Sequence, residues 1–171
     1  MFSSIGRWHL MKKTLLFLDL DACTGCKTCV VACSLRKERK LDTGAARLWV
    51  PKKESICLAV PVICEQCENA PCQNICPTRA ISRDPKTNAL LVDTKKCIGC
   101  KECVWACPFG AITVRHGVAI KCDLCDGDPE CAKVCIPKAI QYTSLEEEGF
   151  DKKWRSLEKR IKALATIVGG K

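Results

Sequence analysis

Short apolar runs of two to six residues recur along the chain, and polar residues separate them. Three of the runs lead into groups of cysteines, and three others follow such groups. The runs occupy residues 15–20, 80–81, 89–92, 111–114, 118–120 and 139–142. Because short apolar runs bounded by turn residues are typical of buried strands, each run predicts a strand.

Two segments between these strands have helical character. Residues 29–39 and 103–107 place cysteines four positions apart, which puts them on one face of a helical turn. Pro77 and Pro108 lack an N–H and have a fixed φ, so each directs the chain out of a turn and back towards a strand. The repeated order of strand, cysteine loop, helical turn and strand predicts an α+β fold.

The last 28 residues, 144–171, have a different pattern. Apolar side chains recur there at spacings of three and four: Phe150, Trp154, Leu157, Ile161, Leu164 and Val168. Such a stripe predicts a C-terminal amphipathic helix beyond the cysteine-rich core. Docking to a partner subunit is the favoured interpretation. Packing on the chain's own core and binding to a membrane surface are the alternatives.

Seventeen cysteines carry the clearest chemical signal, and sixteen of them form four quartets. In chain order the quartets are Cys23, Cys26, Cys29, Cys33; Cys64, Cys67, Cys72, Cys76; Cys97, Cys100, Cys103, Cys107; and Cys122, Cys125, Cys131, Cys135. The first and third share the spacing C-x2-C-x2-C-x3-C, and a shift of 74 residues superposes them. The second and fourth have a longer middle gap. This internal repetition predicts a fold built from copies of one unit.

The spacing of the first and third quartets is that of bacterial ferredoxins, in which thiolates bind a cubane iron–sulfur cluster. Sixteen such ligands predict four [4Fe–4S] clusters. Zinc bound by four thiolates is the alternative, although zinc ribbons usually separate two C-x2-C pairs by a longer stretch. Cys57 lies outside the quartets and is expected to be a buried free thiol. We assign no ligand or catalytic role to His9 or His116.

In two-cluster ferredoxins, the fourth cysteine of one run binds the other cluster. The second and third quartets start 33 residues apart, which suits a compact inner module at about residues 60–115. The first and fourth would then pair in an outer module, residues 12–59 plus 116–143. The two ferredoxin-like modules would therefore be nested within a core at residues 12–143. The predicted ligand sets are Cys97, Cys100, Cys103 with Cys76; Cys64, Cys67, Cys72 with Cys107; Cys23, Cys26, Cys29 with Cys135; and Cys122, Cys125, Cys131 with Cys33.

Charge and composition exclude some classes. The formal charge of +9 suggests nucleic acid, but four clusters with four thiolates each contribute −8 and leave about +1. No apolar stretch is long enough for a membrane span. Residues 11–20 imitate a secretion signal, but Asp19 interrupts them and no cleavage site follows, so a cytoplasmic protein is expected. The chain has no nucleophile–base constellation or nucleotide fingerprint, which predicts no catalytic site.

The four quartets in this order resemble the four-cluster ferredoxin-like electron-transfer subunits of redox complexes. The resemblance covers residues 12–143 and rests on CTGCKTCVVAC, CEQCENAPCQNICPTRAI, CIGCKECVWACPFGAI and CDLCDGDPECAKVCIPKAI. It implies the same nested pairing, with electrons passing between a catalytic subunit and a flavin or NAD subunit or a ferredoxin.

The short gap at residues 126–130 is most similar to the iron–sulfur subunits of tungsten aldehyde oxidoreductase-type complexes. This resemblance implies a tungsten or molybdenum pterin partner and anaerobic metabolism. Hydrogenase, carbon monoxide dehydrogenase and formate systems are the alternatives within the electron-transfer class. A zinc-stabilised interaction module is the alternative outside it. Self-association of copies of the chain stays open at this point.

Overall fold

The computed structural model describes residues 14–144 and Glu158. Its strands are β1 (Thr14–Leu18), β2 (Lys52–Lys53), β3 (Leu58–Ala59), β4 (Ile81–Arg83), β5 (Leu90–Val92), β6 (Ile112–Arg115), β7 (Val118–Lys121) and β8 (Ile140–Ser144). Its helices are α1 (Thr28–Glu38), α2 (Pro71–Asn74), α3 (Glu102–Ala106) and α4 (Glu130–Lys133). Three short 3-10 turns are η1 (Thr43–Ala45), η2 (Glu54–Ile56) and η3 (Leu124–Gly127). The predicted α+β class is confirmed, with mixed short helices and small sheets.

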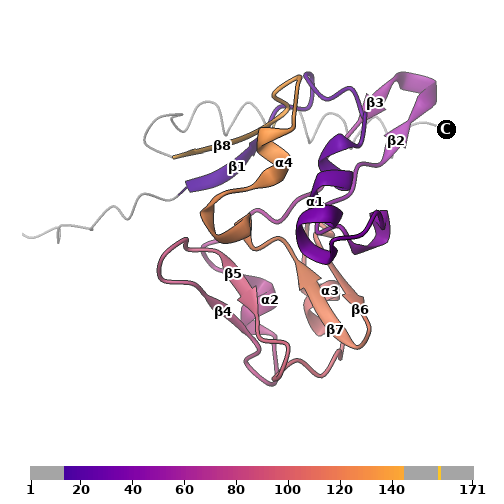
Figure 1. Ribbon diagram of the computed structural model, residues 1–171. Coiled ribbons are helices and arrows are strands. Elements are labelled where there is room, and N and C mark those ends of the chain that lie inside the picture. Colours follow the sequence, from indigo (N-terminus) through magenta and orange to yellow (C-terminus); the bar gives the residue numbers. More distant parts are fainter. Residues whose placement is uncertain (1–13, 145–157, 159–171) are drawn as a thin grey trace, which may run out of the picture.

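The strands form antiparallel pairs rather than one continuous sheet. Three of the pairs are local hairpins, β2–β3, β4–β5 and β6–β7. The fourth joins the two ends of the described chain, because β1 pairs with β8 and places Leu18 opposite Ile140. Residues more than a hundred positions apart in the sequence therefore lie side by side (Figure 1).

The β6–β7 hairpin turns through His116 and Gly117, whose φ angles are 50° and 76°. Two consecutive residues at positive φ are what a two-residue type I′ turn requires, and this turn matches the twist of the flanking strands. The turn also brings the backbone of Gly117 against the third cysteine loop, at Gly99.

The helices pack in two pairs, α1 on α4 and α2 on α3. In Figure 1 the first pair lies beside β1 and β8 in the upper part of the view, and the second lies among β4 to β7 in the lower part. Helix α1 ends where Arg39 adopts a left-handed conformation and donates its backbone N–H to Leu35 O. Each pair thus joins a helix from one cysteine quartet to a helix from another.

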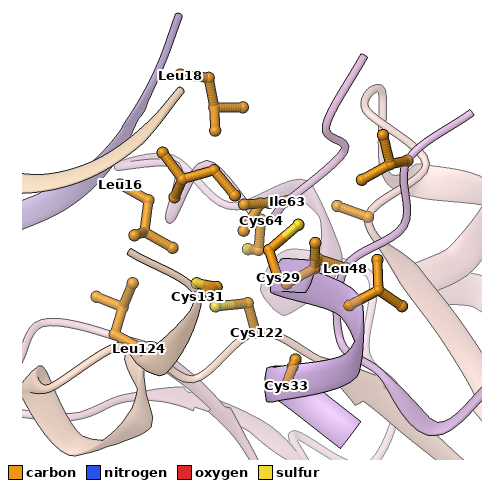
Figure 2. Close-up of a cluster of buried hydrophobic side chains, with 14 of the residues drawn as sticks. Leu16, Leu18, Cys29, Cys33, Leu48, Ile63, Cys64, Cys122, Leu124 and Cys131 are labelled. Carbon is orange, nitrogen blue, oxygen red and sulfur yellow. The ribbon is translucent and has the colours of Figure 1, made fainter. Parts of the chain in front are cut away.

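Buried residues form two clusters, and cysteines belong to both. The larger cluster contains Leu16, Leu18, Leu48, Ile63 and Ile140 together with cysteines of the first, second and fourth quartets. Figure 2 shows Cys29, Cys64, Cys122 and Cys131 converging within it. The smaller cluster contains Ile81, Leu90 and Ile112 with Cys72 and Cys103. Cysteines of all four quartets therefore contribute to the buried core.

The expected strands all occur, with bounds shifted by one or two residues. The β2–β3 hairpin was not expected, because β2 consists of two lysines, Lys52–Lys53, and β3, Leu58–Ala59, is only two residues long. The expectation for Cys57 was wrong: this residue caps η2 at a φ of 49° and its side chain is exposed. The amphipathic helix expected over residues 150–168 lies outside the described residues, apart from Glu158, which is helical. Within the described part of the chain, no helix has the length and apolar character needed to cross a membrane.

Candidate metal centres

The first group of sulfurs combines three cysteines of the first quartet with one from the fourth. Cys23, Cys26 and Cys29 line a pocket together with Cys135, which follows α4. Burial, together with the neighbouring charges of Cys135 and Cys26, raises the pKa of Cys29 to about 11. The β1–β8 pair and the α1–α4 packing bring these two distant segments together.

The second group has the same composition in the other half of the molecule. Cys97, Cys100 and Cys103 of the third quartet line a pocket with Cys76, the last cysteine of the second quartet. The two pockets have similar volumes, about 330 and 340 Å³ including the parts open to solvent. The similarity follows the 74-residue repeat seen in the sequence.

The repeat extends to the backbone of the two loops. Gly25 and Gly99 both have a φ of 66°, and Lys27 and Lys101 both adopt left-handed conformations just before α1 and α3. At Gly99 a Cβ atom would lie 2.4 Å from Gly117 O, so only glycine fits without movement. These turns curl each loop so that its cysteines face one pocket.

The third group gathers Cys122, Cys125 and Cys131 with Cys33 from α1. Burial raises the pKa of Cys131, and the charges of Cys122, Cys33 and Cys125 raise it further. All four of these side chains are buried. Two ion pairs link the segments that carry these cysteines: the carboxylate of Asp123 lies 2.7 Å from Lys37 of α1 and 2.7 Å from Arg47.

The fourth group contains Cys64, Cys67 and Cys72 with Cys107 from the end of α3. Burial, together with the charges of Cys64 and Cys107, raises the pKa of Cys72 to about 11. Burial also raises the pKa of Cys67, with contributions from Cys64 and Cys107. Shared pockets thus bring together the eight cysteines of the first two groups, whereas the membership of the third and fourth groups stays a prediction.

Backbone N–H groups point at several of the sulfurs. Four sulfurs accept such bonds: Cys33 from Arg47 at 3.3 Å, Cys76 from Ala80 at 3.3 Å, Cys97 from Ala119 at 3.3 Å and Cys135 from Ile140 at 3.4 Å. A hydrogen bond to sulfur favours the charged thiolate over the thiol. Two of these donors, Ala119 and Ile140, belong to the strands β7 and β8.

At the interior positions burial has the opposite effect, because it favours the neutral thiol over the thiolate. It raises the pKa of Cys122 to about 12, well above that of an exposed thiol. Four buried thiolates side by side are therefore unfavourable unless a cation neutralises them, and a coordinating metal deprotonates such thiols. The donor sets consequently fit iron–sulfur clusters, which take four cysteine thiolates each.

Single metal ions need closer ligands. One zinc ion holds its four thiolates about 3.8 Å apart, given Zn–S bonds of about 2.3 Å. Among the residues that the structure describes, no group of three or more cysteine, histidine, aspartate or glutamate side chains is placed to hold one ion. The four cysteine groups are not contracted around a single ion.

Two supporting residues were missed at the sequence level. Lys121 is 2% exposed, and its Nζ donates to Leu90 O at 2.6 Å and Cys122 O at 3.0 Å. Gln66 binds the same two residues, accepting from Leu90 N at 2.8 Å and donating to Cys122 O at 2.9 Å. The two-residue alternation in β7 puts Lys121 on the same face as buried Ala119, which is the signal that could have identified it.

Comparisons with known proteins agree with this chemistry. Residues 56–145 match the family model described as a 4Fe-4S dicluster domain, and residues 14–35 match a 4Fe-4S binding domain. The polyferredoxin-like subunit of aliphatic sulfonate oxidoreductase from Pyrococcus furiosus is 39% identical over 129 residues, covering 74% of each chain. The thiosulfate reductase electron transfer subunit PhsB of Salmonella typhi is 36% identical, covering 81% of this chain and 80% of its own.

A third relative, the electron transport protein HydN of Escherichia coli, is 34% identical over 171 residues. The match covers 82% of this chain and 95% of HydN. The cysteine groups, the matching family models and these relatives all indicate multiple bound [4Fe–4S] clusters. The chain belongs to the 4Fe-4S dicluster domain family, within the ferredoxin-like iron–sulfur proteins of electron transfer.

Proposed function

We propose that this chain is the electron-transfer subunit of an oxidoreductase complex and carries four [4Fe–4S] clusters. The four cysteine groups described above are the proposed ligand sets, each with three cysteines of one quartet and the fourth of another. The proposed domains are an inner module at about residues 60–115 and an outer module formed by residues 12–59 and 116–143. The β1–β8 pairing and the α1–α4 and α2–α3 packing support this nested arrangement.

The distribution of exposure among the ligands carries the proposal. Of the sixteen quartet cysteines, only Cys26 and Cys100 are exposed. Cys26 belongs to the group around Cys23, and Cys100 to the group around Cys97. The other two groups contain only buried and half-buried ligands, so they are the more interior pair.

The contacts between groups give a linear order. Cys29 and Cys131, and likewise Cys64 and Cys122, pack within one buried cluster (Figure 2). Cys103 and Cys107 lie one helical turn apart on α3 and its end. The proposed path therefore starts at the Cys26 end, passes through the groups of Cys131 and Cys64, and leaves at the Cys100 end. Such a path connects two separate docking faces.

When bound, the clusters accept and release single electrons at potentials set by nearby charge, hydrogen bonds and burial. The chain's own residues supply those three influences. Backbone N–H groups of Arg47, Ala80, Ala119 and Ile140 donate to ligand sulfurs. Buried apolar side chains such as Leu48 and Ile63 exclude water from the interior groups. We propose no catalytic site on this chain.

The proposed catalytic partner is a tungsten or molybdenum pterin subunit of the aldehyde oxidoreductase type, supported by the compact gap at residues 126–130. Relatives named as subunits of a sulfonate oxidoreductase and a thiosulfate reductase support a role in such complexes. A flavin or NAD subunit, or a ferredoxin, would exchange electrons at the other end. Hydrogenase, carbon monoxide dehydrogenase and formate systems are the alternative partners.

The test is to isolate the native complex anaerobically through a tag on this chain and to measure its metals. Iron with tungsten or molybdenum is the expected result. Nickel in place of these metals would move the partner to hydrogenase or carbon monoxide chemistry. Zinc with little iron would contradict electron transfer and favour an interaction module.

A further inference from the structure

Lys121 is the most deeply buried cation among the described residues. It ends β7 and directly precedes the ligand Cys122. Its two hydrogen-bond acceptors, Leu90 O and Cys122 O, are neutral backbone carbonyls. No carboxylate in the described part of the chain forms a salt bridge with it. An unpaired buried charge is costly, so its negative counterpart must lie elsewhere.

The surroundings identify that counterpart. Lys121 binds the backbone carbonyl of the ligand Cys122 directly, and its other acceptor, Leu90, packs in the same buried cluster as the ligand Cys72. Cys72 belongs to the group around Cys64, and Cys122 to the group around Cys131. These are the two interior groups of the proposed path. Lys121 therefore lies at the junction where the two groups approach each other.

A metal-loaded group of four thiolates carries a net charge of about −2 when the cluster core is 2+. Reduction takes up one electron from an external donor, breaks no bond and adds one negative charge. A buried ammonium stabilises this more negative form, and the low dielectric around it leaves the interaction poorly screened. The same charge on the surface would act weakly, because solvent and salt screen it.

We propose that Lys121 is the shared buried counter-ion of the two interior cysteine groups and that its charge raises their reduction potentials. This inference rests on the four-cluster assignment proposed above. It gives Lys121 a positioning role without direct ligation, in which one side chain tunes two neighbouring groups together. The neutral side chain of Gln66 hydrogen-bonds to the backbones of the same two residues, Leu90 and Cys122, and so links the two segments that surround Lys121.

The test is an anaerobic redox titration of the full chain, followed by electron paramagnetic resonance, with Lys121→Met beside wild type. The expected result is that two of the four one-electron steps become at least tenfold less favourable, which is a fall of about 59 mV. Lys95→Met is the matched control, because it removes the same charge from an exposed position two residues before Cys97. The reduction potentials of the Lys95→Met variant should shift far less from the wild-type values.

Lys121→Gln separates charge from hydrogen bonding, since it keeps an N–H donor but not the charge. It should lower the same two steps. Wild-type potentials in Lys121→Gln or Lys121→Met, at full iron content, would overturn the inference. Loss of iron from both variants would also overturn it, by assigning Lys121 a structural role alone. Fewer than four one-electron steps in the wild-type chain would instead overturn the cluster assignment itself.

Discussion

Cys76 is the residue at which the exchange of ligands between quartets is easiest to test. It follows α2 and lines the pocket of Cys97, Cys100 and Cys103, and its sulfur accepts a hydrogen bond from Ala80 N at 3.3 Å. We predict that Cys76→Ser perturbs the cluster of the third quartet and leaves that of Cys64, Cys67 and Cys72 intact. Electron paramagnetic resonance spectra of the reduced variant would report which signal changes.

Cys57→Ser is the matched control. Cys57 is exposed and its Sγ makes only a 3.9 Å contact with Glu54 O, so iron content should stay at the wild-type value. If Cys76→Ser altered only the cluster of its own quartet, the exchanged-ligand model would be wrong.

Two glycines with almost the same backbone conformation allow the cost of backbone strain to be separated from the cost of a steric clash. Gly99 and Gly110 have φ angles of 66° and 61°, and a left-handed conformation costs an alanine about 1–2 kcal/mol. A Cβ on Gly99 would also meet Gly117 O, whereas one on Gly110 has no atom within 4 Å. We predict that Gly99→Ala lowers the temperature at which visible cluster absorbance is lost more than Gly110→Ala does. Equal losses would show that the β6–β7 turn is not held against the third loop.

The cysteine quartets could be identified from the sequence, since ligand spacing follows from the geometry of the loop, and their division into four ligand sets stays a prediction. The roles of Lys121 and Cys57 could not. The burial of Lys121 could not be predicted because charge alone does not report burial, and one of its two hydrogen-bond acceptors, Leu90 O, lies on a distant part of the chain. Cys57 was expected inside because isolated cysteines are usually buried, but the η2 turn carries it outward.

At the scale of elements, the β1–β8 pair closes the described chain and supports the first metal group. Ile140 is 2% exposed, lines the pocket of Cys23 and Cys26, and donates its N–H to Cys135 Sγ. Truncating a buried isoleucine to alanine costs about 2–5 kcal/mol. We predict that Ile140→Ala accelerates thermal loss of iron from this group.

Gln141→Ala on the same strand is the control for that prediction. Gln141 is only half-buried, and its side chain donates to Lys138 O, so the change should cost about 0.5 kcal/mol or less. Iron loss at the same rate in both variants would contradict a supporting role for the β1–β8 pair. Iron per chain over time at a fixed elevated temperature is the measurement.

The strands next to the cysteine groups and the two longer helical segments were predictable because apolar runs and cysteine spacing mark them. The four-residue helices α2 and α4 were not individually expected, since one turn leaves too little periodicity to detect. The β2–β3 hairpin was missed for the same reason. The role of this hairpin is evident only from the folded structure, in which Lys52 and Ala59 pack against Gly25 of the first cysteine loop.

For the whole molecule, the metal content decides the charge. The chain without metal has a formal charge of +9, with every thiol counted as neutral. Four clusters with four thiolates each would bring this to about +1. We therefore predict that the loaded protein focuses at a markedly lower pH than the metal-free chain in anaerobic isoelectric focusing. Unchanged focusing after loading would contradict four charged sites.

The most direct test of the central claim is the iron and acid-labile sulfide content of the anaerobically purified chain, with zinc measured in the same sample. Four [4Fe–4S] clusters require about sixteen iron and sixteen sulfide ions per chain. That result, with negligible zinc, is the one that we predict. About eight of each would leave two of the cysteine groups without clusters, and zinc in place of iron would contradict the electron-transfer function.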